Sequence, residues 1–426
     1  MDGIDSLRGT TRDFRDPTGP DLLRRTGAFE QWRKQRADNG YWPYSRSLRA
    51  APGTSTDVTD AIGVPASGLN FASQDYLSLA TSDALRHAAI AAIEEFGVHS
   101  AGSSAVLGNT ALSLALERDL AEFLCMEHVT LYPTGWAAGY GVTKGLVRPT
   151  DYALLDALAH NCLVEGAYAA TRNVSMFAHR DHGRLRELLS RIRARDVDNG
   201  ILVITEGLFS MDADVPDILA TQAVCKEFGA TLVVDVAHDL GALGPGGSGS
   251  LGIQGCLGKV DLVMGSFSKT FGSNGGFVAS HLGSVKQFLK VFSPSNTFSN
   301  ALSPAQAAVV RAALTIVRSE QGRVLRARLM RNIVALRSEL TGHGLSVMGE
   351  PSPIVPVLLG DEALARRAAR HLSSQGVLAN LVEFPAVPGG HARFRLQVMA
   401  AHEPEHAARA AAGIAAAVAL AQVESR

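Results

Sequence analysis

The sequence predicts an α/β protein: a mostly parallel β-sheet covered by helices on both faces, with a smaller α+β region after it. Two observations predict this class. Short apolar runs alternate with helix-like runs through the middle of the chain, which is typical of parallel strands joined by crossover helices. After about residue 303 the pattern changes to long helices and more widely spaced strands. With 426 residues, 46% of them hydrophobic, the chain can build a large core and more than one domain.

The middle of the chain supplies the elements of the predicted sheet. The strand-like runs are VTLYP (129–133), DYALLD (151–156), GILVITEG (200–207), TLVVDVAHD (231–239), DLVMGSFS (261–268) and GGFVAS (275–280). The helix-like runs between them or before them are 109–126, 183–196 and 217–229. Because ligands of open α/β sheets gather at the carboxyl ends of the strands, the polar residues that close each run are the candidate site.

The flanking regions are predicted to form separate parts. A polar arm covers residues 1 to about 20, and a helix-like run at 22–40 ends on a glycine. One or two long helices are expected over 303–344, then strands at 352–360 and 391–402 with a helix between them, and a last helix. We therefore expect an N-terminal arm and helix (1–70), a large domain (71–305) and a small C-terminal α+β domain (306–426).

Charge and cysteine content favour a protein of the cytoplasm. The 40 basic and 41 acidic residues nearly cancel, so no general attraction to nucleic acid or to an anionic membrane is expected. The four cysteines are far apart and predict buried thiols in a reducing compartment. No secretory signal is visible, and the alanine-rich run 407–423, which contains Arg409, predicts a packed helix and no membrane span. The histidines show no metal-binding spacing, so no metal is expected.

Two residues of the candidate site have complementary chemistry. Asp235 closes a strongly apolar strand, where a carboxylate is costly unless it meets a cation such as a protonated pyridine nitrogen. Lys269 lies in the small-residue turn GSFSKTFGSNGG, which leaves room for a cofactor bound to its amine. A helix cap or an ion pair for Asp235, and an exposed loop position for Lys269, are the alternatives that spacing alone leaves open.

The other residues at the strand ends could bind the remainder of such a cofactor. A phosphate needs backbone N–H groups and hydroxyls at a helix start. The residues that offer them are Thr134, Gly135, Trp136, Ser266 and Ser268, although ordinary helix capping would use the same groups. His160 could lie on an aromatic ring or act as an acid, and His238 could orient Asp235 or contact a ring oxygen. The strand-end list also includes Glu206 and Ser210.

Taken together, the motifs resemble the α-oxoamine synthases, a branch of the fold-type I pyridoxal-phosphate (PLP) enzymes. The motifs that carry the resemblance, in family order between about residues 70 and 415, are NFASQDYLSLA, HSAGSSAVLGNT, YPTGWAAG, DALAHN, TEGLFSMDAD, VDVAHDLG, GSFSKTFGSNGG and ARFRLQVMAAH. The resemblance implies an aspartate-aminotransferase-like fold with a seven-stranded sheet. It also implies pyridoxal 5′-phosphate as cofactor and a homodimer with its active site at the interface.

The resemblance also implies roles for single residues. Lys269 matches the Schiff-base lysine that later moves the Cα proton, and Asp235 matches the carboxylate on the pyridine nitrogen. His160 matches the histidine stacked on the ring, while His238 and Ser210 match positions near the ring hydroxyl. The positions that match phosphate contacts are Gly135, Trp136 and Ser266. Those that match the amino-acid carboxylate site are Arg395 and Gln74.

Three departures from the family pattern concern the substrate. Ala105 stands where the family often has arginine, and Glu383 stands where oxononanoate synthases carry a second carboxylate-binding arginine. The usual NDYLGL is QDYLSL. A glycine, alanine or serine condensation in a lipid or specialised-metabolite pathway is therefore expected at least as much as the biotin-pathway reaction.

The implied activity is the decarboxylative condensation of an amino acid with an acyl thioester, carried by coenzyme A or a carrier protein, to an α-amino ketone, CO2 and free thiol. Two alternatives remain open. One is an aminotransferase of the same fold. The other is a non-catalytic partner subunit of a palmitoyltransferase-like complex.

Overall fold

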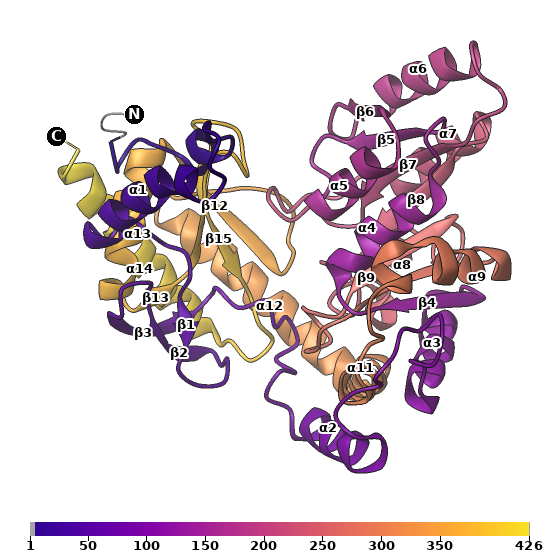
Figure 1. The fold of residues 1–426 in the computed structure, drawn as a ribbon. Helices are drawn as coiled ribbons and strands as arrows, with labels where there is room; N and C mark the ends of the chain where they lie inside the picture. Colours follow the sequence, from indigo (N-terminus) through magenta and orange to yellow (C-terminus); the bar gives the residue numbers. More distant parts are fainter. Residues whose placement is uncertain (1–4, 426) are drawn as a thin grey trace. The chain divides into compact units, whose positions relative to one another are not determined.

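The computed structural model describes residues 5–425, and its chain divides into two compact units. The large unit comprises Asp75–Ser210 and Asp214–Ala327. The small unit comprises the chain up to Gln74, the short segment Met211–Ala213, and the chain from Arg328 onward. Figure 1 shows the elements of both units.

A seven-stranded sheet forms the centre of the large unit. Its strands, in spatial order, are β4 (His128–Tyr132), β10 (Gly276–Ser280), β9 (Leu262–Ser266), β8 (Thr231–Asp235), β7 (Ile201–Glu206), β5 (Tyr152–Asp156) and β6 (Asn173–Phe177). The pairs from β9 to β6 are parallel, and only β10 runs antiparallel to both of its neighbours. The predicted fold class is confirmed.

Helices flank this sheet on both faces (Figure 1). The helices of the large unit are α2 (Asp83–Phe96), α3 (Ala111–Leu124), α4 (Gly135–Leu146), α5 (Asn161–Ala170), α6 (His182–Arg193), α7 (Ile218–Glu227), α8 (Gly249–Ile253), α9 (Gly283–Phe292), α10 (Pro294–Thr297) and α11 (Pro304–Arg318). Only the start of α4 was expected, at Thr134, and the elements that were not predicted are β6, α2, α5, α8, α9 and α10. β6 has only one buried residue, so its sequence lacks the apolar run of the central strands.

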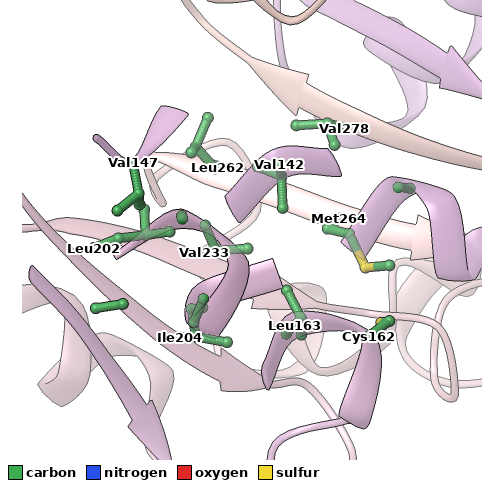
Figure 2. Packing of buried hydrophobic residues seen from close by; sticks show 14 of the residues in the cluster. Val142, Val147, Cys162, Leu163, Leu202, Ile204, Val233, Leu262, Met264 and Val278 are labelled. Atoms are coloured by element: carbon green, nitrogen blue, oxygen red, sulfur yellow. The ribbon is translucent and has the colours of Figure 1, made fainter. Parts of the chain in front are cut away.

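The core of the large unit lies between the sheet and the paired helices α4 and α5. The cluster in Figure 2 includes Val142 of α4 and Leu163 of α5 together with Ile204 and Met264 of the sheet. The two helices approach closely because Gly139 faces Cys162, where an added Cβ would lie 2.3 Å from Sγ. This close packing fixes the N-termini of α4 and α5 at the carboxyl edge of the sheet.

The small unit contains two four-stranded sheets. One consists of β1 (Ser47–Leu48), β2 (Ser55–Thr59), β3 (Pro65–Asn70) and β13 (Val377–Leu378), and the other of β11 (Ser346–Val347), β12 (Ile354–Gly360), β15 (Ala392–Gln397) and β14 (Asn380–Val382). Its helices are α1 (Gly27–Asp38), α12 (Glu320–Gly342, from Arg328), α13 (Glu362–Leu372) and α14 (Pro404–Val423). The run at 303–344 thus forms two helices, α11 and α12.

The unit boundaries differ from the expected domain boundaries at two places. Residues up to Gln74 belong to the small unit because β3 pairs in parallel with β13, Leu69 opposite Val377. The segment 306–327 belongs to the large unit because α11 packs against α2 and α3. Both are long-range pairings that local composition does not encode.

Helix α14 is long and apolar enough to cross a membrane by length and composition alone, which is weak evidence by itself. In the structure it packs against α13. The side of α14 that is buried carries Ala407, Ala410, Ile414 and Ala417. These buried side chains contribute to packing within the small unit.

Candidate active site

A cavity of about 260 Å³ lies at the carboxyl ends of the central strands of the large unit. Ten residues that the sequence singled out line it: Thr134, Gly135, Trp136, His160, Glu206, Asp235, His238, Ser266, Ser268 and Lys269. They come from the ends of β4, β7, β8 and β9 and from the starts of α4 and α5. The fold thus brings together side chains that are up to 135 positions apart in the sequence, from Thr134 to Lys269.

Two buried carboxylates form one wall of the cavity. Glu206 and Asp235 are the last residues of neighbouring parallel strands and lie directly opposite each other in register. Burial raises the pKa of Glu206 well above its usual range, and the charge of Asp235 raises it further. Burial also raises the pKa of Asp235, but the nearby His160 and Lys269 side chains oppose this shift. We therefore assign the proton to Glu206 and the negative charge to Asp235.

Hydrogen bonds hold both carboxylates in place. Asp235 Oδ1 accepts from the backbone N–H of Ala237 at 2.9 Å. Glu206 Oε1 accepts from the backbone N–H of His160 at 2.6 Å. Asp235 thus presents a buried anion to the cavity, and Glu206 ties the start of α5 to the end of β7.

The two histidines of the site are each held by a neighbour. His160 is the N-cap residue of α5, and its Nδ1 accepts from the backbone N–H of Cys162 at 3.2 Å. His238 Nδ1 lies 2.9 Å from the hydroxyl of the fully buried Tyr76. Tyr76 was not predicted as a site residue, although it lies in the QDYLSL motif.

The part of the cavity wall at the start of α4 has the features of a phosphate site. Thr134 caps α4, its Oγ1 accepting from the Ala137 N–H at 3.0 Å. Ser266 lies against the first turn of this helix, where a Cβ added to Gly135 would be 2.3 Å from its Oγ. Ser266 and Ser268 place their hydroxyls 2.8 Å apart. A helix N-terminus flanked by hydroxyls is a favourable environment for a phosphate dianion.

Lys269 lies three residues beyond the end of β9, in the turn that leads to β10. This turn needs small residues. Gly275 has φ +112°, and a Cβ added to it would lie 2.9 Å from the Phe267 ring. The donor set of the cavity fits PLP, because it offers a buried anion for a pyridinium, an amine for an aldehyde and a helix N-terminus for a phosphate.

Three predicted residues do not line this cavity. Ser210 is in the large unit, but it is absent from the cavity wall and is followed directly by the Met211–Ala213 segment of the small unit. Gln74 and Arg395 both belong to the small unit. Their assignment to substrate binding stays a prediction.

Arg395 is nevertheless a well-held side chain of the small unit. It lies on β15, is 9% exposed, and its Nη1 is 3.6 Å from Met211 Sδ. When the Gln397 amide is oriented with its oxygen toward the guanidinium, it accepts from Arg395 Nε at 2.8 Å. The neighbouring Arg393 forms an ion pair with Asp212 and donates to the carbonyl of Met211 at 3.0 Å.

Glu383 forms buried ion pairs with two arginines, which the sequence did not predict. Arg366 Nε donates to its Oε2 at 2.6 Å, and Arg36 Nη2 donates to Oε1 at 3.3 Å. Arg36 also stacks on Trp32, with 4.7 Å between its guanidinium carbon and the ring centroid. All three charged side chains are almost fully buried. Glu383 therefore joins α1 to α13 within the small unit.

Several residues of the cavity wall were missed in the sequence. They are Cys162, Ala237, Met264, Asn274 and Gly275. Cys162 and Met264 also belong to the apolar core shown in Figure 2, so the cavity floor is continuous with that core. Asn274 and Gly275 could have been found, since they lie in the turn already chosen for Lys269. Among residues 5–425, no group of three or more His, Cys, Asp or Glu side chains could hold a metal.

Comparison with known proteins gives a consistent result. Residues 66–414 match the family model of aminotransferase class I and II. The 8-amino-7-oxononanoate synthase of Geobacter sulfurreducens is 35% identical over 370 residues, covering 87% of this chain and 93% of that protein. The corresponding enzyme of Geobacter metallireducens is 36% identical over 344 residues, covering 81% and 87%.

The solved structures include a serine palmitoyltransferase from S. paucimobilis with bound PLP. It superimposes with a TM-score of 0.87 at 26% identity, covering 95% of this chain and 100% of that one. The chain therefore belongs to the aminotransferase class I and II family and, within it, to the α-oxoamine synthases, which are fold-type I PLP enzymes.

Proposed function

We propose that this protein condenses an amino acid with an acyl thioester, releasing CO2 and free thiol and forming an α-amino ketone. The observation that carries the proposal is the single cavity in which Asp235 and Lys269 meet at the carboxyl edge of the sheet. When bound there, PLP supplies a cationic ring that withdraws the electron pair released at the substrate α-carbon.

Asp235 keeps the ring cationic in this proposal. Its carboxylate is buried and held by the Ala237 N–H, so it remains fixed while the charge opposite it develops. A preoriented anion in a water-poor site stabilises a pyridinium more than a solvated one does. Protonated Glu206, on the next strand, avoids a second negative charge beside it.

Lys269 is proposed to hold the cofactor at rest and to move protons once the amino acid has taken its place. The amine Nζ accepts the α-proton and later returns a proton to the same carbon after CO2 has left. Its position in a turn of small residues leaves the side chain room to move between these tasks. Thr134, Gly135, Trp136, Ser266 and Ser268 are proposed to anchor the phosphate throughout.

Arg395 and Gln74 are proposed to hold the carboxylate of the amino acid, and Ser210 and His238 to contact the ring hydroxyl. An arginine that grips the carboxylate orients the α-carbon bonds and so selects which bond breaks. The burial of Arg395 and its fixed neighbours Met211 and Gln397 support this role, because the guanidinium is oriented before substrate arrives. The glycine, alanine or serine specificity expected from the sequence is part of this proposal.

A homodimer with its active site at the interface is also proposed. The large unit exposes Val106, Leu107 and Phe298, which are 84%, 86% and 87% exposed. The segment that carries Val106 and Leu107 is joined to the segment of Phe298 by a hydrogen bond. In it, Ser104 Oγ donates to Asn296 Oδ1 at 2.6 Å. Exposed apolar side chains clustered in this way are typical of a protein interface.

A location in the cytoplasm is proposed as well. The four cysteines form no disulfide, which is typical of proteins in a reducing compartment.

The test is an assay of carboxyl-labelled amino acids with and without an acyl thioester, measuring CO2, free thiol and the ketone by mass. We expect CO2 release that requires the thioester and is matched by equal amounts of thiol. An aminotransferase would instead form an oxo acid without thioester and without loss of the label. A PLP-loaded protein that shows neither reaction with any amino acid would favour the partner-subunit alternative.

A further inference from the structure

His160 is held from two directions by groups outside its own ring. Its backbone N–H donates to Glu206 Oε1 at 2.6 Å, across from the adjacent strand end. Its ring Nδ1 accepts from the Cys162 backbone N–H at 3.2 Å, where the ring serves as the cap of α5. A histidine ring used as a helix cap is unusual, because serine, threonine, aspartate and asparagine fill this position far more often.

The cap decides which ring nitrogen carries a proton. A backbone N–H can only donate, so the Nδ1 that accepts from it carries no hydrogen. The Cys162 Sγ lies 3.0 Å from the same nitrogen. Burial raises the pKa of the Cys162 thiol, so the sulfur keeps its hydrogen and can donate as well. The remaining nitrogen, Nε2, therefore carries the proton of the neutral ring.

We propose that Glu206 and the first turn of α5 lock His160 as the Nε2–H tautomer, so that it faces the cofactor cavity as a hydrogen-bond donor and never as a base. Glu206 is a positioning residue in this scheme, since it acts on the site by holding the backbone of His160. This inference rests on the proposed function, and it leaves Lys269 as the group of the site that takes up the α-proton.

The state of Glu206 fits this role. Its side chain is 3% exposed, and burial together with the charge of Asp235 raises its pKa well above the usual range. A protonated carboxyl keeps an oxygen that can accept from the His160 N–H without adding a second charge beside Asp235. Replacing Glu206 with alanine would remove this acceptor from the His160 N–H, and we expect PLP retention to weaken by about tenfold or more.

The tautomer can be measured directly on the PLP-loaded protein. Histidine labelled with ¹⁵N gives separate signals for protonated and unprotonated ring nitrogens, and a His160→Asn variant identifies the signals of His160 by their loss. Asparagine is a suitable replacement because its side-chain oxygen can still cap α5. We expect an unprotonated Nδ1 and a protonated Nε2. A protonated Nδ1 would overturn the proposal, whether or not the protein is active.

Two further variants test the positioning role. Glu206→Ala should weaken PLP retention by about tenfold and reduce the visible circular dichroism of the bound cofactor, because His160 loses its backbone anchor. Glu206→Gln keeps an oxygen acceptor and should keep most of the dichroism. Cys162→Ser keeps the backbone N–H and should leave the Nδ1 signal in place. Equal dichroism in the alanine and glutamine variants would show that Glu206 does not position His160.

These outcomes separate the inference from the proposed function. If the tautomer is as expected but no thioester-dependent CO2 appears, only the assigned reaction fails. If CO2 is released but Nδ1 is protonated, the reaction stands and the locked tautomer is wrong.

Discussion

Glu206 and Asp235 stand opposite each other at the ends of two neighbouring parallel strands, and both side chains are buried. Two like charges at this spacing and burial do not ionise together, so the pair shares its charge unequally. The protonated member anchors His160, and the ionised member is the one that we propose for the pyridine nitrogen of the cofactor. The strand register thus sets the electrostatics of the site.

Asp235→Asn should lower kcat by about 10²–10³-fold while leaving the fold intact, because the amide cannot hold the ring cationic. Unfolding of the cofactor-free protein should occur at the same or a higher temperature, since burial already raises the pKa of Asp235 and the amide removes a buried charge. Thermal melting and steady-state kinetics check both parts. A variant with undiminished kcat contradicts the role of Asp235.

Lys269→Ala should remove the visible absorbance band of the PLP-loaded protein and lower activity by about 10³-fold or more, because no other amine of the cavity wall can replace it. The matched control is Lys259→Ala, an exposed lysine whose Nζ donates to the Gly255 carbonyl. The control should keep the band. Spectra recorded after removal of unbound PLP give the answer.

Asp239→Asn should stabilise the protein in alkaline solution. Burial raises the pKa of Asp239 from 3.8 to about 7. Folding of the wild-type protein favours the protonated Asp239 carboxyl. The contribution of this proton to the free energy of unfolding is complete below about pH 3.8 and is lost as the pH rises through about 7. Asparagine does not titrate, and its oxygen can still accept from the Ser250 N–H. The melting temperature of the variant minus that of the wild type should therefore grow between roughly pH 5 and pH 8, the range in which Asp239 loses its proton. A constant difference would contradict it.

His179→Gln should destabilise the protein near neutral pH but not at high pH. Burial alone would lower the pKa of His179, but hydrogen bonds to Asp156 and Asp214 raise it to about 9. Their lengths are 2.8 and 2.7 Å. The stabilisation is complete below the unfolded value of 6.5 and is lost as the pH rises through about 9. Melting curves across this range should show the two proteins converging, and parallel curves would exclude the ion-pair explanation.

Glu383→Gln should lower the free energy of unfolding by about 3–5 kcal/mol, because it leaves the Arg36 and Arg366 guanidiniums buried without their counter-ion. The control is Glu320→Gln, which breaks a solvent-exposed pair with Arg323 and should leave the free energy of unfolding nearly unchanged. Denaturant unfolding of both variants provides the comparison. Equal effects would show that the buried cluster adds no stability.

The sequence by itself determined the fold class and most of the cavity wall. Apolar runs that closed on polar residues marked the strands, and parallel strands carry their ligands at their carboxyl ends, so Glu206, Asp235 and Lys269 could be named from local pattern alone. Strand β6 was missed because its residues are mostly not buried, and an apolar run is what reveals a strand. Residue chemistry suggested the roles of Asp235 and Lys269, and family resemblance supplied most of the others.

The tertiary structure alone decided what touches what. Glu383 looked like a change at a substrate site, but long-range packing surrounds it with Arg36 and Arg366. The boundary at Gln74 followed from the pairing of β3 with β13, more than 300 positions later in the chain. The opposition of Glu206 and Asp235 and the capping of α5 by His160 depend on strand register and helix placement. Periodicity records the environment of each residue, whereas partners that are distant in sequence are set only when the chain packs.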